Sequence, residues 1–128
     1  MVHIHDVMKR DIVTVEDRMS VSSVANLMRI QRIGSVLVKR EGEIVGIVTE
    51  SDIVRKVVSM HRFAEYTPVH RIMSKPVICI DEDSPIFEAA DLMDRSHIRH
   101  LGVANRHDGI IGVLSVRDLL HPVAIDEF

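Results

Sequence analysis

The feature that most constrains this chain is a repeat within its own sequence. Shifted by 65 residues, the 128-residue chain matches itself at apolar positions such as Met8 and Met73. After one extra residue in the turn 106–109, the shift becomes 66 residues and Gly46 matches Gly112. Structural repeats tolerate an insertion of this kind because turns lie on the surface. We therefore expect two copies of one folding unit.

Each copy predicts the same order of elements, β-α-β-β-α. Apolar residues at i, i+3, i+4 and i+7, beginning at Val21 and at Ile86, favour an amphipathic helix in each copy. β-Branched runs favour strands, and Asp108-Gly109 favours a hairpin turn between two of them. Strands are expected at 12–15, 36–38, 44–48, 77–80, 101–104 and 110–114, and second helices from Ser51 and Arg117 onward.

The fold class expected from this order is α/β (α+β), with two three-stranded sheets flanked by helices. The first repeat is assigned to residues 1–66 with its N-terminal lead-in, and the second to residues 67–128 with its C-terminal tail. A unit of about 60 residues buries too little surface to be stable alone. We therefore expect the two sheets to pack face to face about a pseudo-two-fold axis.

The composition disfavours several classes of protein. The net charge of −3 and the pI of about 6.2 provide no basic surface, so nucleic-acid binding is not expected. Cys79 is the only cysteine, which rules out an intrachain disulfide and fits a reducing compartment. The sequence contains neither an apolar run long enough to span a membrane nor a signal core. We expect a cytoplasmic protein.

A repeated phrase places reactive groups at the end of the third strand of each copy. Residues 46–52 and 112–118 share the order Gly, two apolar residues, a hydroxyl residue, two variable residues and Asp. The hydroxyl and the carboxylate thus lie where a strand meets a helix N-terminus, a place that favours phosphate. A carboxylate can also accept both hydrogen bonds of a ribose cis-diol. Ser, Thr and Asp are common helix caps as well, and capping is compatible with binding.

These paired phrases, together with the strand entry at residues 98–103, resemble CBS (cystathionine-β-synthase) domains. The pair resembles a Bateman module of the stand-alone kind over residues 6–120. The resemblance implies a regulatory, energy-sensing module that binds AMP, ADP, ATP or a similar adenosine-containing ligand. S-adenosylmethionine and NAD(H) are alternative ligands. The module would signal to an unidentified partner protein by a conformational change.

The resemblance also implies two crossed crevices, in which the hydroxyl and the Asp of one repeat meet the first strand of the other. Backbone amides near Val13 and Val77 would contact the adenine edge, and Ile47 and Val113 would cover its face. The first crevice would use Ile47, Thr49, Asp52, Val77, Ile78 and Arg99. The second would use Val113, Ser115, Arg117, Asp118, Val13, Ile33, Gly34 and His100.

The two crevices are expected to be unequal because Arg99 and His100 belong to the second repeat alone. Successive strand residues face opposite sides of a sheet, so each of them can serve a different crevice. The first repeat has the uncharged Gly34 and Ser35 at these positions. The alternative interpretation is a surface charge at Arg99 and a half-buried histidine at His100. The second crevice is therefore the favoured one.

No catalytic or metal site is expected. The sequence shows no triad, P-loop or pair of acids, and Cys79 lies in an apolar run that predicts a buried, inert thiol. His3 and His5, beside Asp6 at what we expect to be a mobile terminus, leave metal coordination incomplete. We expect neither turnover nor a catalytic cofactor, and a requirement for magnesium stays open.

Apolar residues in the second helices favour the association of two modules. These helices are more apolar than a solvent-facing helix requires, at Ile53, Val54, Val57, Val58, Leu119 and Leu120. The resemblance implies a homodimer, a flat disc of four repeats, and packing against their own sheet is the alternative for these residues. A second hypothesis for the function is a constitutive dimeric scaffold with vestigial ligand crevices. The sequence gives no support to an enzyme that consumes bound nucleotide.

Overall fold

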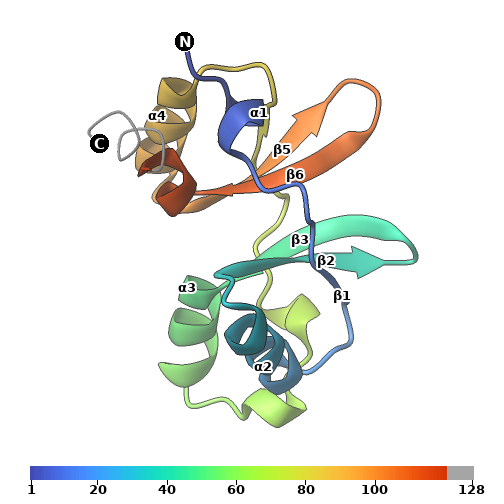
Figure 1. Ribbon diagram of the computed structural model, residues 1–128. Helices are drawn as coiled ribbons and strands as arrows, with labels where there is room; N and C mark the ends of the chain where they lie inside the picture. Colours follow the sequence, from blue (N-terminus) through green and yellow to red (C-terminus); the bar gives the residue numbers. More distant parts are fainter. Residues whose placement is uncertain (121–128) are drawn as a thin grey trace. The chain divides into compact units, whose positions relative to one another are not determined.

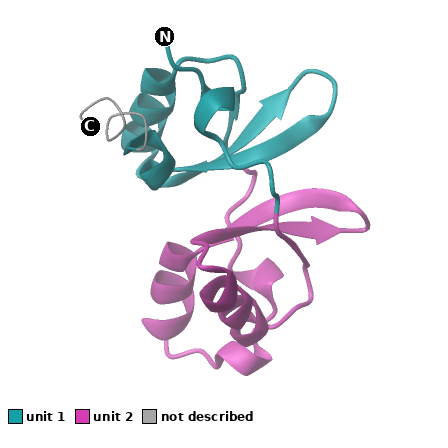
Figure 2. Cartoon of the chain, in the orientation of Figure 1, with its two compact units in different colours: residues 1–12, 78–128 teal, residues 13–77 magenta. Residues whose placement is uncertain are grey.

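The computed structural model describes residues 1–120 and divides the chain into two compact units. Unit 1 combines Met1–Ile12 with the chain from Ile78 onward, and unit 2 is Val13–Val77 (Figure 2). The repeats at 1–66 and 67–128 describe the sequence, whereas the compact units place residues 1–12 with the sheet of the second repeat. The segment that precedes the first strand of each repeat, residues 1–12 and 67–77, is here called its lead-in. Each lead-in thus lies in a different unit from the strands of its own repeat.

Unit 2 is a mixed three-stranded sheet accompanied by helices (Figure 1). Its strand order is β1-β2-β3, in which β1 runs parallel to β2 and β3 runs antiparallel to it. The strands are β1 (Thr14–Glu16), β2 (Ser35–Arg40) and β3 (Glu43–Thr49). The helices are α2 (Val21–Gln31), α3 (Glu50–Ile53), the π-helical η1 (Val54–Val58), and the 3-10 turns η2 (Ala64–Tyr66) and η3 (Val69–Arg71).

Unit 1 has the same topology, with the order β4-β5-β6 and a parallel pair followed by an antiparallel one. Its strands are β4 (Cys79–Asp81), β5 (His100–Asn105) and β6 (Gly109–Ser115). Its helices are α1 (Ile4–Val7), α4 (Ile86–Ser96) and a helical segment at 116–120. The predicted order β-α-β-β-α is confirmed in both copies.

The first strands begin two residues later than the sequence predicts. Pairing of β1 starts at Thr14, and Val13 only accepts a hydrogen bond from the Leu37 N–H at 3.0 Å. Ile78 does the same for the Gly102 N–H at 2.9 Å before β4 begins. The reason is the path of the chain, which passes from one unit to the other immediately before each of these strands.

The long helices begin and end as their sequences direct. The Ser20 hydroxyl accepts the Ser23 N–H at 3.1 Å at the start of α2, whereas α4 begins after Pro85. Arg32 and His97 end the two helices in the left-handed region, with φ near 55° in both. Within residues 1–120, no helix has the length and apolar character needed to cross a membrane.

The lead-in before each first strand completes the core of its unit. Ile4 and Met8 pack with the buried residues of unit 1, and the sequence-equivalent Val69 and Met73 pack with those of unit 2. Lys9 then bridges to Val113 on β6, as Ser74 bridges to Ile47 on β3. Each lead-in therefore adds a short antiparallel pairing to the outer edge of the third strand.

This pairing explains the glycine at the start of each repeated phrase. A Cβ atom on Gly46 would lie 2.7 Å from the Met73 sulfur, and one on Gly112 would lie 2.7 Å from the Lys9 carbonyl oxygen. The glycines are needed because the lead-in passes directly over them. This first residue of the phrase therefore serves packing within its unit.

Candidate functional site

The hydroxyl and the aspartate of the first phrase form a capping box at the junction of β3 and α3. The Asp52 N–H donates to Thr49 Oγ1 at 3.2 Å, while the Thr49 N–H donates to Asp52 Oδ2 at 3.0 Å. The Thr49 hydroxyl also lies 3.2 Å from the same oxygen. Asp52 is 6% exposed, so its carboxylate is held in one orientation below the surface.

The second phrase repeats this box at the end of β6. The Asp118 N–H donates to Ser115 Oγ at 3.3 Å, and the Ser115 N–H donates to Asp118 Oδ2 at 2.8 Å. The Ser115 hydroxyl contacts the same oxygen at 3.1 Å, and Asp118 is 8% exposed. Capping is thus confirmed as a role of both pairs, and it consumes one carboxylate oxygen of each aspartate.

The second oxygen of each aspartate meets a lysine that the sequence analysis missed. Asp52 Oδ1 lies 2.9 Å from Lys56 Nζ and accepts the Ser74 hydroxyl at 2.9 Å. Asp118 Oδ1 lies 3.3 Å from Lys9 Nζ. Lys9 and Ser74 are equivalent positions of the repeat, so the two lead-ins bring different groups to the same place. The i, i+4 spacing of Asp52 and Lys56 was the one local signal available.

The two aspartates differ in how much acceptor capacity remains. A carboxylate offers about four lone-pair sites. Among the described residues, Asp52 receives four contacts, from the Thr49 N–H and hydroxyl, Ser74 and Lys56. Asp118 receives three such contacts, the last of them from Lys9. A ribose hydroxyl can therefore approach Asp118 without displacing a partner, whereas at Asp52 it must displace one.

In unit 1, β5 and β6 bring a histidine beside the capping box. His100 pairs with Ser115 in the antiparallel register, and directly opposite residues share a face of the sheet. Arg99 is exposed, and its carbonyl accepts the Val116 N–H at 2.9 Å. Arg117 is exposed one residue before Asp118. All three basic residues lie in unit 1, although the crossed prediction assigns His100 and Arg117 to the second crevice and Arg99 to the first.

The residues expected to contact adenine are already engaged in the fold. Ile47 is buried, and its backbone exchanges hydrogen bonds with Ser74 at 3.0 and 2.8 Å. Val113 exchanges the corresponding pair with Lys9, both at 2.9 Å. The Gly34 carbonyl accepts the Glu50 N–H at 3.1 Å. These contacts fix the backbone around each phrase within its own unit.

The predicted site residues are divided between the two units. Unit 2 holds Val13, Ile33, Gly34, Ile47, Thr49, Asp52 and Val77. Unit 1 holds Ile78, Arg99, His100, Val113, Ser115, Arg117 and Asp118. Each phrase forms a complete junction inside one unit, and the crossed combination of residues from both units stays a prediction.

Cys79 differs from expectation. The residue is exposed on β4, so the prediction of a buried thiol is wrong. Partial burial nevertheless raises the pKa of the Cys79 thiol above its usual value of 9.0. The thiolate, which is the nucleophilic form, is therefore scarce at neutral pH.

Several apolar side chains of unit 2 are exposed beyond the capping box. Val54 and Val58 on η1 are exposed, although Val57 between them is buried. Further along the chain, a hollow of about 490 Å³ is lined by Arg62, Phe63, Tyr66, Thr67 and Arg71. The residues predicted to bind nucleotide are absent from this lining. As expected, the second helix of unit 2 carries apolar residues, Val54 and Val58, that its own sheet does not cover.

Sequence comparison identifies the family of these two units. The family model described as "CBS domain" matches residues 4–59 and 69–124. The chain belongs to the CBS-domain family. It is a tandem pair, and the matched stretches include both capping boxes.

Relatives of this CBS pair are known as sequences and as structures. An uncharacterised protein of Methanopyrus kandleri is 36% identical over 120 residues, which are 93% of this chain and 61% of that protein. A CBS-domain protein from Burkholderia ambifaria, thought to act in signal transduction, superposes with a TM-score of 0.87 at 35% identity, covering 93% of this chain and 87% of the other.

A third relative shares the fold and has been crystallised with ligands. It is the CBS domain pair of the protein MJ0100, in complex with 5′-methylthioadenosine and S-adenosylmethionine. The two chains superpose with a TM-score of 0.86 at 21% identity, and the match covers 98% of each. At this identity the likeness establishes a common fold.

Proposed function

We propose that this CBS pair is a regulatory module that binds adenosine-containing nucleotides, such as AMP, ADP or ATP, at the two hydroxyl–aspartate junctions. The observation that carries the proposal is the duplicated capping box, in which a buried aspartate is oriented at a strand end beside a lysine. The complex of a structural neighbour with two adenosyl compounds supports this class of ligand. S-adenosylmethionine and NAD(H) are the alternative ligands.

The chemistry of the junction suits a ribose phosphate. A buried, ionised carboxylate accepts hydroxyl hydrogen bonds that are roughly twice as strong as neutral ones. The lysine beside each aspartate supplies a cation within reach of the same ligand, and His100 adds a second nitrogen donor at the junction of Ser115. At Asp118 the ligand would add its contacts to that of the lysine, whereas at Asp52 it would replace one of the present contacts.

The two junctions are proposed to differ in affinity. The spare acceptor site of Asp118 and the neighbouring His100 and Arg117 favour unit 1. At Asp52, a ribose hydroxyl must compete with Ser74 and Lys56. In the crossed arrangement that we propose, each junction would be completed by the first-strand residues of the other repeat, near Val13 and Val77.

The output is proposed to be a conformational change read by a partner protein. A ligand shifts a protein between two arrangements only if it binds one of them better. We propose no turnover, because neither junction combines a nucleophile with a base, and a high pKa keeps the Cys79 thiol protonated.

Calorimetry provides the direct test of nucleotide binding. Purified protein, freed of small molecules by unfolding and refolding, is titrated with AMP, ADP, ATP, S-adenosylmethionine and NADH, each with and without magnesium. Saturable binding of at least one adenosine compound is expected. Absence of binding by all five would contradict the proposal, and mass spectrometry of the untreated protein would show whether another molecule had co-purified.

The exposed apolar surface supports a second candidate, a homodimer that acts as a constitutive scaffold. Val54, Val58, Met60, Phe63 and Tyr66 are all more than half exposed in the single chain. Apolar side chains in such numbers usually mark an interface. Light scattering should show a dimer, and Val58→Glu should yield a monomer. A dimer whose mass, shape and partner binding are unchanged by every nucleotide would favour the scaffold over the sensor.

A further inference from the structure

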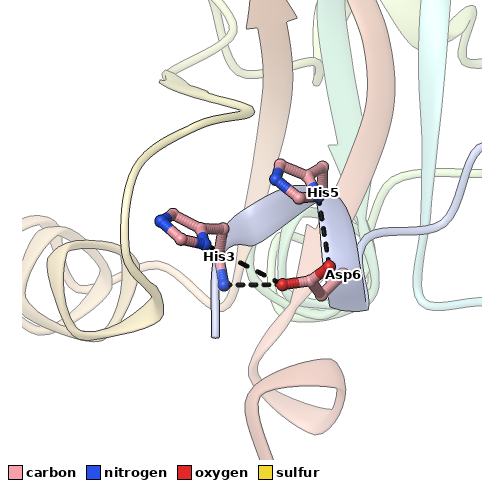
Figure 3. A group of neighbouring side chains, drawn as sticks. All are labelled: His3, His5 and Asp6. Atoms are coloured by element: carbon pink, nitrogen blue, oxygen red, sulfur yellow. Dashed lines mark hydrogen bonds and ion pairs between the residues drawn. The ribbon is translucent and has the colours of Figure 1, made fainter. Parts of the chain in front are cut away.

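Three potential metal ligands lie together on the short helix α1. His3, His5 and Asp6 each offer one ligand atom, and these atoms all lie within 4.8 Å of one another (Figure 3). Both imidazoles are partly exposed, with 39% and 37% of the side-chain surface accessible. We propose that these residues bind a divalent transition-metal ion of the zinc class, at a site separate from the nucleotide junctions.

The backbone under this cluster is fixed, contrary to the expectation of a mobile terminus. Ile4, between the two histidines, is fully buried in the core of unit 1. Its N–H donates to the Ser84 carbonyl and the His5 N–H donates to the Glu82 carbonyl, both at 2.9 Å. Because the buried Ile4 and these two hydrogen bonds hold the backbone of α1 in place, the backbone beside both histidines is already ordered. Metal binding therefore loses less conformational entropy there.

The local contacts orient the donor atoms. His5 Nδ1 lies 3.2 Å from Asp6 Oδ1, and His3 Nδ1 lies 4.0 Å from Asp6 Oδ2. The other nitrogen of His5, Nε2, lies 4.0 Å from Asp83 Oδ1. Histidines that bind metal usually donate the remaining ring N–H to a carboxylate, which fixes the tautomer. Asp83 lies beyond hydrogen-bond distance of His5 Nε2 in this structure, and in the proposed site it would move closer to accept this N–H and leave His5 Nδ1 to face the ion.

The repeat shows that the fold does not require this cluster. In η3, the equivalent element of unit 2, Val69 takes the buried place of Ile4. The residues that correspond to the three ligands there are Pro68, His70 and Arg71. The same fold therefore forms with one imidazole and a cation at these positions. Asp6 Oδ2 also accepts the His3 N–H at 2.9 Å and so caps α1, and the two imidazole rings stack with centroids 5.4 Å apart. The pair of histidines is the addition that the packing of the unit does not require.

The donor set selects the class of ion. Two imidazoles and one carboxylate suit zinc and its first-row neighbours, whereas calcium and magnesium prefer oxygen ligands alone. Three protein ligands leave one position of a tetrahedral ion for water or for a further group. In this arrangement the ion would tie together the first turn of the chain, and through Asp83 the turn before α4.

The test compares zinc binding by the untagged protein with binding by matched variants. Calorimetry with Zn²⁺ and the absorption spectrum with Co²⁺ are expected to show one ion per chain in the wild type and none in the double variant His3→Ala/His5→Ala. The control double variant, His97→Ala/His107→Ala, removes two histidines that lie outside the cluster and should bind like the wild type. Asp83→Asn should weaken binding about tenfold, because it removes the carboxylate nearest His5 Nε2.

Two results would overturn the proposal. One is the absence of one-to-one binding by the folded wild-type protein, and the other is equal binding by the two double variants. Far-ultraviolet circular dichroism establishes that each variant is folded. If the first double variant fails to fold, Asp6→Asn replaces it in the test. This change keeps the shape of the side chain but removes the carboxylate ligand, so it should also reduce binding.

Discussion

Replacement of Asp118 by alanine tests the proposed nucleotide site most directly. The carboxylate would contribute one or two hydrogen bonds to a ribose, and bonds of this kind to a charged group contribute about 1.5 to 3 kcal/mol each. Allowing for imperfect additivity, we expect a loss of about 2 to 4 kcal/mol of binding free energy, or about 30-fold to 700-fold in Kd. The loss should fall on the junction in unit 1.

The same change has a smaller effect on stability. Asp118→Ala leaves the Ser115 N–H without its capping acceptor, which costs about 1 kcal/mol. The lost pair with Lys9 adds little because that lysine is 66% exposed. The protein should therefore remain folded, and a urea unfolding curve would check this before affinity is measured.

Asp52→Ala is the matched control, because it removes the same capping box from the other copy. Since Asp52 has no acceptor site to spare, its loss should weaken nucleotide binding less than the loss of Asp118. Calorimetry on both variants decides the matter. Unchanged affinity and stoichiometry in folded Asp118→Ala, or a larger effect of Asp52→Ala, would refute the reasoning.

Three further predictions follow from single contacts. Lys9→Met should weaken AMP binding about fivefold, because the contact between this lysine and the phosphate contributes about 1 kcal/mol of binding free energy. Binding of adenosine, which has no phosphate, should be unchanged, and calorimetry with both ligands measures the difference. Gly112→Ala should push against the Lys9 carbonyl and make the lead-in more sensitive to trypsin. Gly109→Ala meets no neighbouring atom but strains a positive φ of 73°, so it is the control for strain away from the lead-in and should have less effect there. Hydrogen bonding to Arg40 lowers the pKa of Asp17, so this carboxylate stabilises the fold above its unfolded pKa near 3.8 and the contribution is lost as pH falls below that value. Urea unfolding of Asp17→Asn should therefore depend less on pH in that range.

The element order could be predicted because its signals are local. Helix α2 is recognisable from the spacing of Val21, Val24 and Met28, which are all buried as expected. The repeat doubled the evidence for every strand and for both hydroxyl–aspartate pairs. Capping itself is also a local matter, since it joins residues three positions apart.

The partners of the aspartates could not be predicted in the same way. Lys9 and Asp118 are far apart in the sequence, and only the docking of the lead-in on β6 brings them together. The need for Gly112 has the same origin. Pattern analysis detects periodicity within a segment, but it does not show which sheet a lead-in will join. For the same reason, the sequence alone predicted a mobile terminus at His3 and His5.

The exchange of lead-ins has a consequence for dissecting the protein. Because the chain leaves unit 1 after Ile12 and returns to it at Ile78, two covalent crossings join the units. A single cut in the segment after η1 would divide unit 2 between two chains, one of which carries residues 1–12 of unit 1 and the other the chain from Ile78 onward, so the two pieces would be held together only by the packing inside each unit. A fragment that stops at residue 66 would lack Val69, Ile72 and Met73 from its core. The shortest piece that keeps the whole core of unit 2 is 13–77, whose ends coincide with the crossings and not with the repeat.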